Sequence, residues 1–116
     1  MEQDRKRIHK AGWCILVLYI CLSPATFAER PVITIEIRNH LFIPSEITVP
    51  ANTKVKLMIK NLDSTAEEFE SYELNREKVI LGHQKAVIFI GPLSPGEYPF
   101  FGEFYPKTAQ GKIIVE

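Results

Sequence analysis

The sequence predicts an all-β fold, arranged as a small β-sandwich, and three observations support this prediction. Several short runs alternate apolar and polar residues, which is the period of a strand with one buried face. Dipeptides rich in proline, glycine, asparagine and serine separate these runs and mark turns. The runs are about four to eight residues long, and short strands with such punctuation favour a sandwich over βαβ units.

Four segments are predicted as strands from their apolar residues: 32–38, 53–60, 85–90 and 112–115. In the first, isoleucines alternate with polar residues; in the second, Val55 and alternate residues after it face inward while the lysines face outward. We interpret those lysines as a solvated strand face, because the chain has no surplus of basic residues. The last two segments are more continuously apolar, which predicts strands covered on both sides or shared between two sheets.

Residues 66–80 are the exception, because this stretch is long and polar. Glu73 and Glu77 are four residues apart, as on one face of a helix, but the apolar residues near them make no helical stripe. We therefore predict an extended crossover with at most one helical turn in this part of the chain.

The N-terminal segment has the pattern of an export signal. Residues 1–10 carry several basic side chains, and residues 11–22 are apolar or small. The sequence Thr-Phe-Ala at 26–28 suits cleavage before Glu29. An uncleaved anchor is the alternative, but a membrane-spanning helix needs about 20 apolar residues and the Ser-Pro pair at 23–24 interrupts this run early.

Cleavage divides the chain into a signal peptide, residues 1–28, and one domain, residues 29–116. Cys14 and Cys21 are the only cysteines, so the expected domain contains no thiol. A domain of this length buries a limited fraction of its surface, so we expect a single core without support from a disulfide.

Charge and residue usage exclude several functions. The chain has 14 basic and 14 acidic residues, which removes the electrostatic case for nucleic-acid binding. The expected domain has no cysteine nucleophile, no Gly-x-Ser-x-Gly sequence and no glycine-rich phosphate loop. His83 lies in a Leu-Gly-His-Gln turn sequence and is interpreted as a solvated turn residue. We therefore predict that the protein is not an enzyme, with a hydrolase the least favoured alternative.

The sequence Glu-Glu-Phe-Glu at 67–70 is the first candidate site. On an alternating strand, Glu68 and Glu70 share one face while Glu67 and Phe69 share the other. One carboxylate therefore points in the same direction as a buried aromatic ring, which is costly unless a cation or a metal ion pairs with it.

The aromatic stretch 98–106 is the second unusual segment, and Glu103 is its only acid. If Glu67 or Glu68 converges with Glu103, the carboxylate oxygens suit a hard cation, and His40 would extend the site to copper or iron. The alternative is ordinary ion pairing on a packed loop, in which a basic residue neutralises each acid. The pairs expected in that case are Glu67 with Arg76 or Lys78, and Glu103 with Lys107.

Further motifs carry a resemblance to a known family. They are Phe42-x-Pro44, Val49-Pro50-Ala51-Asn52, Asn61-x-Asp63, Pro95-Gly96-x-Tyr98 and Gly111-x-Ile113-x-Val115. Over nearly all of residues 32–116 the chain resembles the small periplasmic cupredoxin-like proteins, and it is similar to the cupredoxin domain of EfeO-type proteins of bacterial iron uptake. The resemblance implies a Greek-key β-sandwich in the periplasm, with any metal at one end between two loops.

The resemblance also identifies copper ligands that this chain lacks. A blue-copper member has a histidine after the Asn-x-Asp strand and a Cys-x-x-His-x-x-Met-like loop before the last strand. The matching positions here are Glu67, or Glu68 if the alignment shifts by one, and then Gly102, Tyr105 and Thr108. A blue-copper centre needs a thiolate and two imidazoles, so the resemblance implies a domain that cannot form one.

The sequences Glu-Glu-Phe-Glu-Ser and Phe-Phe-Gly-Glu-Phe resemble a subgroup associated with ferrous-iron uptake. Its members commonly carry histidine where this chain has Tyr105, and they act with a periplasmic iron- or copper-binding protein and a membrane iron permease. The resemblance therefore implies an exported metal-binding or electron-handling protein that takes copper or iron. The expected metal ligands are Glu67, Glu68, Glu103 and His40.

A metal-free periplasmic adaptor is the competing hypothesis. In this hypothesis the aromatic end at 100–105 docks onto a membrane permease or a metal-binding partner, and no metal is bound. Under both hypotheses we expect a protein that is not embedded in the membrane once the signal is cleaved.

Overall fold

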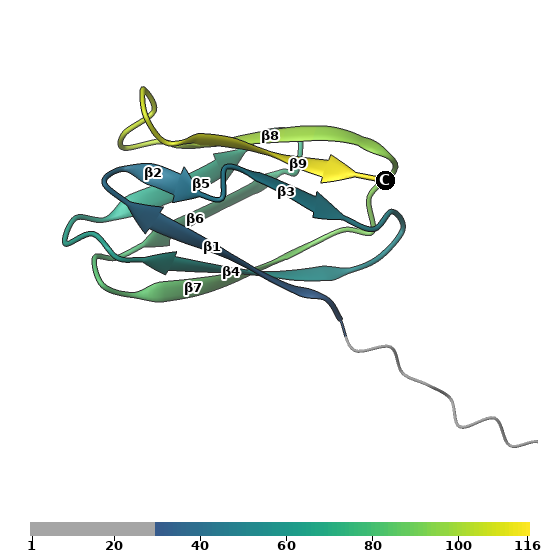
Figure 1. Cartoon of the computed structure of the whole chain (residues 1–116), viewed down its shortest axis with the longest axis horizontal. Helices are drawn as coiled ribbons and strands as arrows, with labels where there is room; N and C mark the ends of the chain where they lie inside the picture. The colour runs from purple at the N-terminus through teal and green to yellow at the C-terminus, as the bar shows by residue number, and fades with distance from the viewer. Residues whose placement is uncertain (1–29) are drawn as a thin grey trace, which may run out of the picture.

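The computed structural model describes residues 30–116, and these residues are all-β. They form nine strands that run along the long axis of the domain (Figure 1). The strands are β1 (Val32–Arg38), β2 (Leu41–Ile43), β3 (Glu46–Val49), β4 (Val55–Asn61), β5 (Glu67–Ser71), β6 (Arg76–Ile80), β7 (Lys85–Ile90), β8 (Gly96–Gly102) and β9 (Gln110–Val115). This part of the chain contains no helix long and apolar enough to cross a membrane. The predicted signal peptide, residues 1–28, lies outside the described residues.

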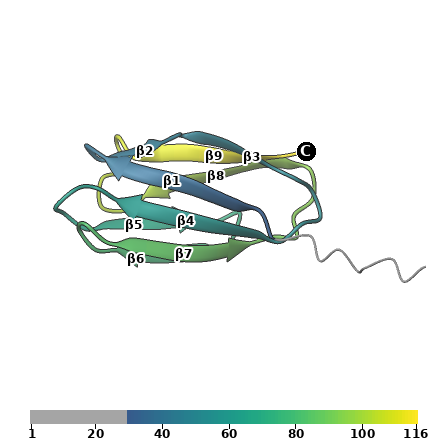
Figure 2. The ribbon, with the colours of Figure 1, turned by 60° about the horizontal axis from the view of Figure 1, so that its bottom comes forward.

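The strands form two sheets that pack face to face as a sandwich. The four-stranded sheet has the order β2-β1-β4-β7, and the five-stranded sheet has the order β3-β9-β8-β5-β6. In Figure 2 the four-stranded sheet faces the viewer. Each sheet is mixed, because β1 with β4 and β3 with β9 are parallel pairs whereas the other neighbours are antiparallel. The predicted all-β sandwich is confirmed.

The core lies between the sheets and consists of alternate residues of each strand. The inward faces predicted for β1 and β4 are confirmed: Ile35, Ile37, Val55, Leu57 and Ile59 are buried, and Ile33 is partly buried. Aromatic rings add to this core, since Phe100 stacks on Phe69 with ring centroids 5.0 Å apart and meets Phe42 edge-on at 5.1 Å. The apolar residues that alternate along the predicted strands are thus the residues with which the two sheets pack against each other.

Two predictions about burial are wrong. Segment 85–90 is strand β7, but it is an edge strand, and Val87 and Phe89 on its outer face are exposed by 37% and 41%. Segment 112–115 belongs to β9, which lies between β3 and β8 within one sheet. The core covers each strand on one face only, because a sandwich of two layers has no third layer to cover the other face.

Residues 66–80 form a hairpin, so the predicted crossover is also wrong. Strands β5 and β6 pair antiparallel through a turn at 72–75, and these residues contain no helical turn. The hydroxyl of Ser71 donates to the carbonyl oxygen of Pro99 at 2.7 Å and accepts the N–H of Leu74 at 3.2 Å, which fixes the turn. Strand β6 is exposed except at Ile80, so its sequence lacks the alternation of a half-buried strand.

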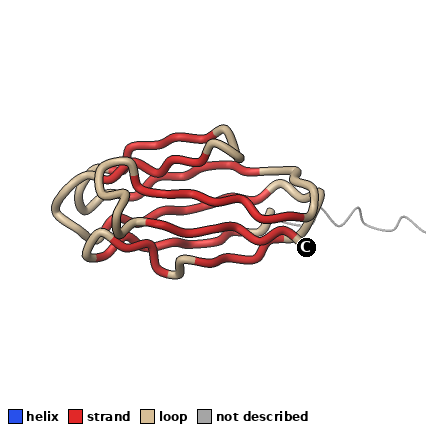
Figure 3. The backbone as a smooth tube through the Cα atoms, turned by 90° about the horizontal axis from the view of Figure 1, so that it is seen from above, coloured by secondary structure: helices blue, strands red, loops and turns tan. Residues whose placement is uncertain are grey.

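The loops 39–40, 62–66, 81–84 and 103–109 lie at one end of the sandwich, at the left in Figure 1, here named the site end. Figure 3 shows the connections gathered at the ends of the strands. Hydrogen bonds join loops at the site end: His83 donates its N–H to the carbonyl oxygen of Asp63 at 2.9 Å, and the hydroxyl of Thr108 donates to that of His40 at 2.7 Å. His83 lies in a turn and is exposed, as predicted.

Candidate metal site

Asn61, the first residue of the Asn-x-Asp motif, holds the loop after β4. Its buried side chain donates to the carbonyl oxygens of Thr65 at 2.8 Å and Ile80 at 3.1 Å. Its Oδ1 atom accepts the N–H of Asp63 at 3.0 Å. Asparagine side chains commonly replace backbone hydrogen bonds in turns in this way. The motif therefore fixes the position of Asp63 at the site end.

Asp63 in turn holds the connection between β1 and β2. Its two oxygens accept the backbone N–H groups of Asn39 at 2.8 Å and His40 at 2.9 Å. Both residues have left-handed φ angles, 52° and 59°, which non-glycine residues adopt only when their surroundings support them. Partial burial acts to raise the pKa of Asp63, but these hydrogen bonds outweigh burial and hold the pKa below its ordinary value.

The ring of His40 stacks on the ring of Tyr105, with centroids 3.5 Å apart and planes inclined by 13°. Its Nδ1 atom lies 3.5 Å from Oδ2 of Asp63. His40 and Tyr105 border an open hollow of about 340 Å³, together with Phe104 and residues 106–108. The predicted ligand His40 is therefore in direct contact with Tyr105.

Glu67 is buried, with 1% of its surface exposed, and shares the inner face of β5 with Phe69. The prediction that one glutamate of this strand points inward is thus confirmed. Its Oε1 atom accepts the N–H groups of Glu68 at 2.8 Å and Phe104 at 2.9 Å, which joins β5 to the loop 103–109. Its Oε2 atom is buried and has no hydrogen-bond partner among the described residues. Such an atom is rare in folded proteins, because it has lost water without compensation.

Gly102 of β8 lies against the carboxylate of Glu67. A Cβ atom at position 102 would stand 2.6 Å from Oε2 of Glu67 and 2.6 Å from Cβ of Ala109. Both distances are shorter than non-bonded contacts in a packed interior. The carboxylate therefore occupies the space that any larger residue at position 102 would need.

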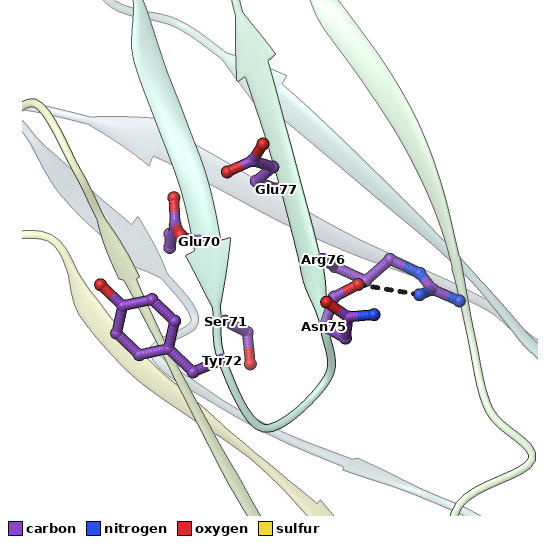
Figure 4. A pocket seen from close by; sticks show the side chains of 6 residues that line it. All are labelled: Glu70, Ser71, Tyr72, Asn75, Arg76 and Glu77. Atoms are coloured by element: carbon purple, nitrogen blue, oxygen red, sulfur yellow. Dashed lines mark hydrogen bonds between the residues drawn. The ribbon is translucent and has the colours of Figure 1, made fainter.

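Glu68 lies on the outer face of β5, where its carboxylate comes within 4.8 Å of those of Glu70 and Glu77. Glu70 and Glu77 are directly opposite one another on the paired strands, and Figure 4 shows their side chains next to each other. Glu103 adjoins this group through its N–H, which donates to the carbonyl oxygen of Glu68 at 2.9 Å. Partial burial and the charges of these neighbouring carboxylates raise the pKa of Glu70.

The alternative of ordinary ion pairs for Glu67 and Glu103 is wrong. Among residues 30–116 the ion pairs join Arg38 to Glu36, and Lys112 to Glu46 and Glu97, and the ring of His40 lies 3.5 Å from the carboxylate of Asp63. Arg76, an expected partner of Glu67, donates instead to the carbonyl oxygen of Phe89 at 3.0 Å. It also donates to the carbonyl oxygen of Asn75 at 2.9 Å (Figure 4). No basic side chain in this range is within ion-pair distance of either glutamate.

The four predicted ligands lie in three places. Glu67 is inside the sandwich, Glu68 and Glu103 are on the outer side of β5, and His40 lies against Tyr105. Within residues 30–116, one set of at least three potential metal ligands lies within 4.8 Å of one another, and it consists of Glu68, Glu70 and Glu77. Of the four predicted ligands, this set includes only Glu68. Asp63 was not among the predicted site residues, although its place in the Asn-x-Asp motif was a signal for it.

The profile of the cupredoxin-like domain family matches residues 12–115 of the chain. The chain belongs to this family. A relative described as "Uncharacterized protein RP394", from Rickettsia prowazekii (strain Madrid E), is 48% identical over 83 residues. The match covers 72% of this cupredoxin-like chain and 66% of the length of that relative.

Several solved structures share the fold of this cupredoxin-like domain. Auracyanin A, a blue copper protein from Chloroflexus aurantiacus, has a TM-score of 0.64 and 14% identity over 73% of this chain and 98% of that chain. The metal binding domain of the Cu(I) exporting P-type ATPase CopA of Streptococcus pneumoniae D39, solved with Cu(I), has a TM-score of 0.62 and 17% identity over 73% and 84%. A purple cupredoxin from Nitrosopumilus maritimus has a TM-score of 0.56 and 18% identity over 72% and 98%. At these identities the likeness concerns the fold alone.

A blue-copper centre does not fit this cupredoxin-like domain. Residues 30–116 contain no cysteine, and the carboxylate of Glu67 fills the space beside Gly102. A cation bound by oxygen fits better, because Oε2 of Glu67 is a buried acceptor without a donor among the described residues. Carboxylates prefer harder cations than thiolates do, so the donor set present here differs in kind from that of a blue-copper protein.

Proposed function

We propose that this cupredoxin-like protein is exported to the periplasm and serves ferrous-iron uptake by binding copper or iron through oxygen ligands, with Glu67 as the buried ligand. The observation that carries the proposal is the unpartnered Oε2 atom of Glu67. A cation would neutralise this carboxylate and supply the interaction that no described donor supplies. Copper or iron held here would supply a one-electron redox couple.

The two carboxylate oxygens of Glu67 have different roles in this proposal. Oε1 accepts the N–H of Phe104, and Oε2 is left for the cation. Cation binding at Oε2 would therefore change the charge of the same carboxylate that holds the loop 103–109 through its hydrogen bond to Phe104. The carboxylates of Glu68, which is partly buried, and of Glu103, which is exposed, lie on the outer side of β5 and would attract a cation toward this end of the strand.

His40 has a different place in the proposal. Stacking on Tyr105 leaves the nitrogen lone pairs of the His40 ring, which lie in the plane of the ring, available to a metal ion. Asp63 holds the backbone of His40 and keeps the ring at the site end. We therefore assign His40 as an additional ligand and Asp63 as the residue that positions it.

The assignment to iron uptake rests on the resemblance in the Glu-Glu-Phe-Glu-Ser and Phe-Phe-Gly-Glu-Phe segments. The partners it suggests are a periplasmic iron- or copper-binding protein and a membrane iron permease. Metal handling as a use of this fold is supported by auracyanin A, a blue copper protein, and by the metal binding domain of CopA, solved with Cu(I). The proposed role is that of an accessory protein rather than of an enzyme.

The test is metal binding by protein purified from the periplasmic fraction of an expressing bacterium. We expect about one equivalent of Cu(II) or Fe(II), measured by calorimetry and by elemental analysis after gel filtration. Glu67→Gln should lose this binding, whereas Glu97→Gln, a matched change of an exposed acid, should retain it. Full binding by a variant in which Glu67, Glu68 and Glu103 are all glutamine would overturn the proposal.

A metal-free adaptor is the second candidate, and the hollow of about 340 Å³ beside His40 and Tyr105 favours it. Phe104 at this hollow is exposed by 47%, and exposed aromatic residues are common anchors of protein interfaces. In this case a pull-down with the metal-free protein as bait should recover a permease or a metal-binding protein from solubilised membranes. The Phe104→Ser variant should recover less of this partner. Recovery that requires prior metal loading would exclude the adaptor.

A further inference from the structure

The outer face of the four-stranded sheet, here named the basic face, gathers cationic side chains from several strands. Its residues are those that alternate with the core residues of β1, β4 and β7. Across these strands the paired rows are Val32–Lys56–Phe89, Thr34–Met58–Val87 and Glu36–Lys60–Lys85. Figure 2 shows the three strands side by side in one layer. The lysines interpreted from the sequence as one solvated strand face therefore belong to a larger surface.

The positive charge of the basic face is largely unbalanced. Arg30 and Lys54 extend it, because their cations lie 5.6 Å and 5.5 Å from the ring centroid of Phe89. Glu36 is the only acid in the three rows, and it is paired with Arg38 at 3.1 Å. Within residues 30–116 no ion pair involves a lysine of β4 or β7. The basic face thus has a net positive charge that no described carboxylate neutralises.

Apolar side chains lie between these cations. Val32 is exposed by 57%, Val87 and Phe89 are also exposed, and Met58 between them is partly buried. Apolar area and attraction to anionic lipids are the two features by which peripheral proteins bind the headgroup region of a membrane. The stems of lysine side chains can lie along such an apolar surface while their amines reach phosphate groups.

The opposite face of the sandwich has the reverse charge. Its outward residues include Glu46, Glu68, Glu70, Glu77 and Glu97 of the five-stranded sheet. Lys112 on this face is paired with Glu97 at 3.2 Å and with Glu46 at 3.7 Å. An anionic surface therefore attracts one sheet and repels the other, which would give the domain a defined orientation.

The chain also enters the domain at the basic face. Arg30 is the first described residue, and its side chain lies over Phe89. Residues 23–29 separate it from the apolar run 11–22 and span at most about 25 Å when fully extended. Before the predicted cleavage, an apolar run seated in the membrane would therefore keep the basic face within this distance of the lipid headgroups.

We propose that the basic face docks on bilayer surfaces rich in anionic phospholipids and holds the domain there as a peripheral membrane protein. The cations and apolar side chains are spread over three strands, so the arrangement suits a continuous charged surface. This proposal goes beyond the proposed metal function and does not depend on it, because Glu67 belongs to the other sheet. A failure of either proposal leaves the other intact.

The experiment is co-sedimentation of the purified protein with vesicles. We expect binding to an equimolar mixture of phosphatidylglycerol and phosphatidylcholine, little binding to phosphatidylcholine alone, and loss of binding as salt is added. A variant with Lys56, Lys60 and Lys85 changed to glutamine should bind at least about tenfold more weakly. The matched control changes lysines outside the basic face, Lys78, Lys107 and Lys112, to glutamine and should bind as the unmodified protein does.

Three results would overturn this proposal. The first is equal binding to both kinds of vesicle, and the second is an equal loss of affinity in the two lysine variants. The third is salt-sensitive self-association without vesicle binding, which would show that the basic face binds the acidic face of a second copy of the protein. The salt titration of the unmodified protein decides the question even if the basic-face variant fails to fold.

Discussion

The carboxylate carbon of Glu67 lies 2.5 Å from the point at which a Cβ atom of residue 102 would stand. The register of the five-stranded sheet produces this approach, because Phe69 of β5 pairs with Gly102 of β8 and Glu67 lies on the same face as Phe69. A buried carboxylate at position 67 therefore requires glycine at position 102. The side chains at positions 67 and 102 are therefore sterically coupled in this domain.

Gly102→Ala should lower the free energy of unfolding by about 2 kcal/mol, because the added Cβ atom overlaps the carboxylate of Glu67. In a Glu67→Ala background the same change should cost less, since the carboxylate is gone. Chemical denaturation of the four proteins measures the coupling energy, which we expect to exceed about 0.5 kcal/mol. Strictly additive effects would show that the two positions do not compete for space.

Glu67→Ala should destabilise the protein more than Glu67→Gln does. Alanine leaves the N–H groups of Glu68 and Phe104 without an acceptor, at a cost of about 1–3 kcal/mol for each buried group, whereas glutamine keeps the Oε1 acceptor. Amide hydrogen exchange of Phe104 should accelerate at least about tenfold in the alanine variant only. Equal exchange rates in both variants would show that this hydrogen bond does not hold the loop 103–109.

Asp63→Asn should destabilise the protein at neutral pH but have a smaller effect in acid. Hydrogen bonds from Asn39 and His40 keep the pKa of Asp63 below its ordinary value, so its charged form stabilises the fold. This contribution is complete above the ordinary pKa and is lost as the pH falls through the folded-state pKa. Denaturation from neutral pH down to about pH 2 should show a shrinking difference between the two proteins. A difference that stays constant with pH would contradict this account.

Glu77→Gln should raise the melting temperature at neutral pH. Glu77 lies directly opposite Glu70, and the raised pKa of Glu70 means that its charged form is unfavourable in the folded protein. The repulsion is absent while Glu70 is protonated, below its unfolded-state pKa, and develops as the pH rises through the folded-state pKa. The gain should therefore vanish in acid. Glu73→Gln removes the same charge from the exposed turn and should give little gain at either pH.

The sequence predicted the parts of the fold in which one face is buried and the other is solvated. Strands β1 and β4 show regular alternation, and their inward residues are the buried ones. Strand β6 was not predicted because it is an edge strand that is exposed except at Ile80, so its sequence does not alternate between apolar and polar residues. Strands β2 and β8 were missed for other reasons, since the first has three residues and the second contains Pro99.

The candidate site was predictable only where it depends on local alternation. Glu67 was correctly expected to point inward because it is two residues from the buried Phe69. The same alternation places Glu68 on the other face, so the two neighbouring acids cannot both face one ion from within the sandwich. Two other contacts at the site join segments that are far apart in sequence, so no local sequence pattern could predict them. They are the stack of His40 on Tyr105 and the hydrogen bonds from the β1–β2 turn to Asp63.

The central claim is that Glu67 gives this cupredoxin-like protein an oxygen-bound metal in place of a blue-copper centre, and a Cu(II) titration followed by absorption and electron paramagnetic resonance tests it most directly. We predict saturation at about one equivalent, without the intense band near about 600 nm that a copper–thiolate bond produces. The resonance signal of protein-bound Cu(II), recorded after gel filtration removes free copper, should be absent from Glu67→Gln and present in Glu97→Gln. An unchanged copper signal in Glu67→Gln, or no binding by the unmodified protein, would contradict the claim.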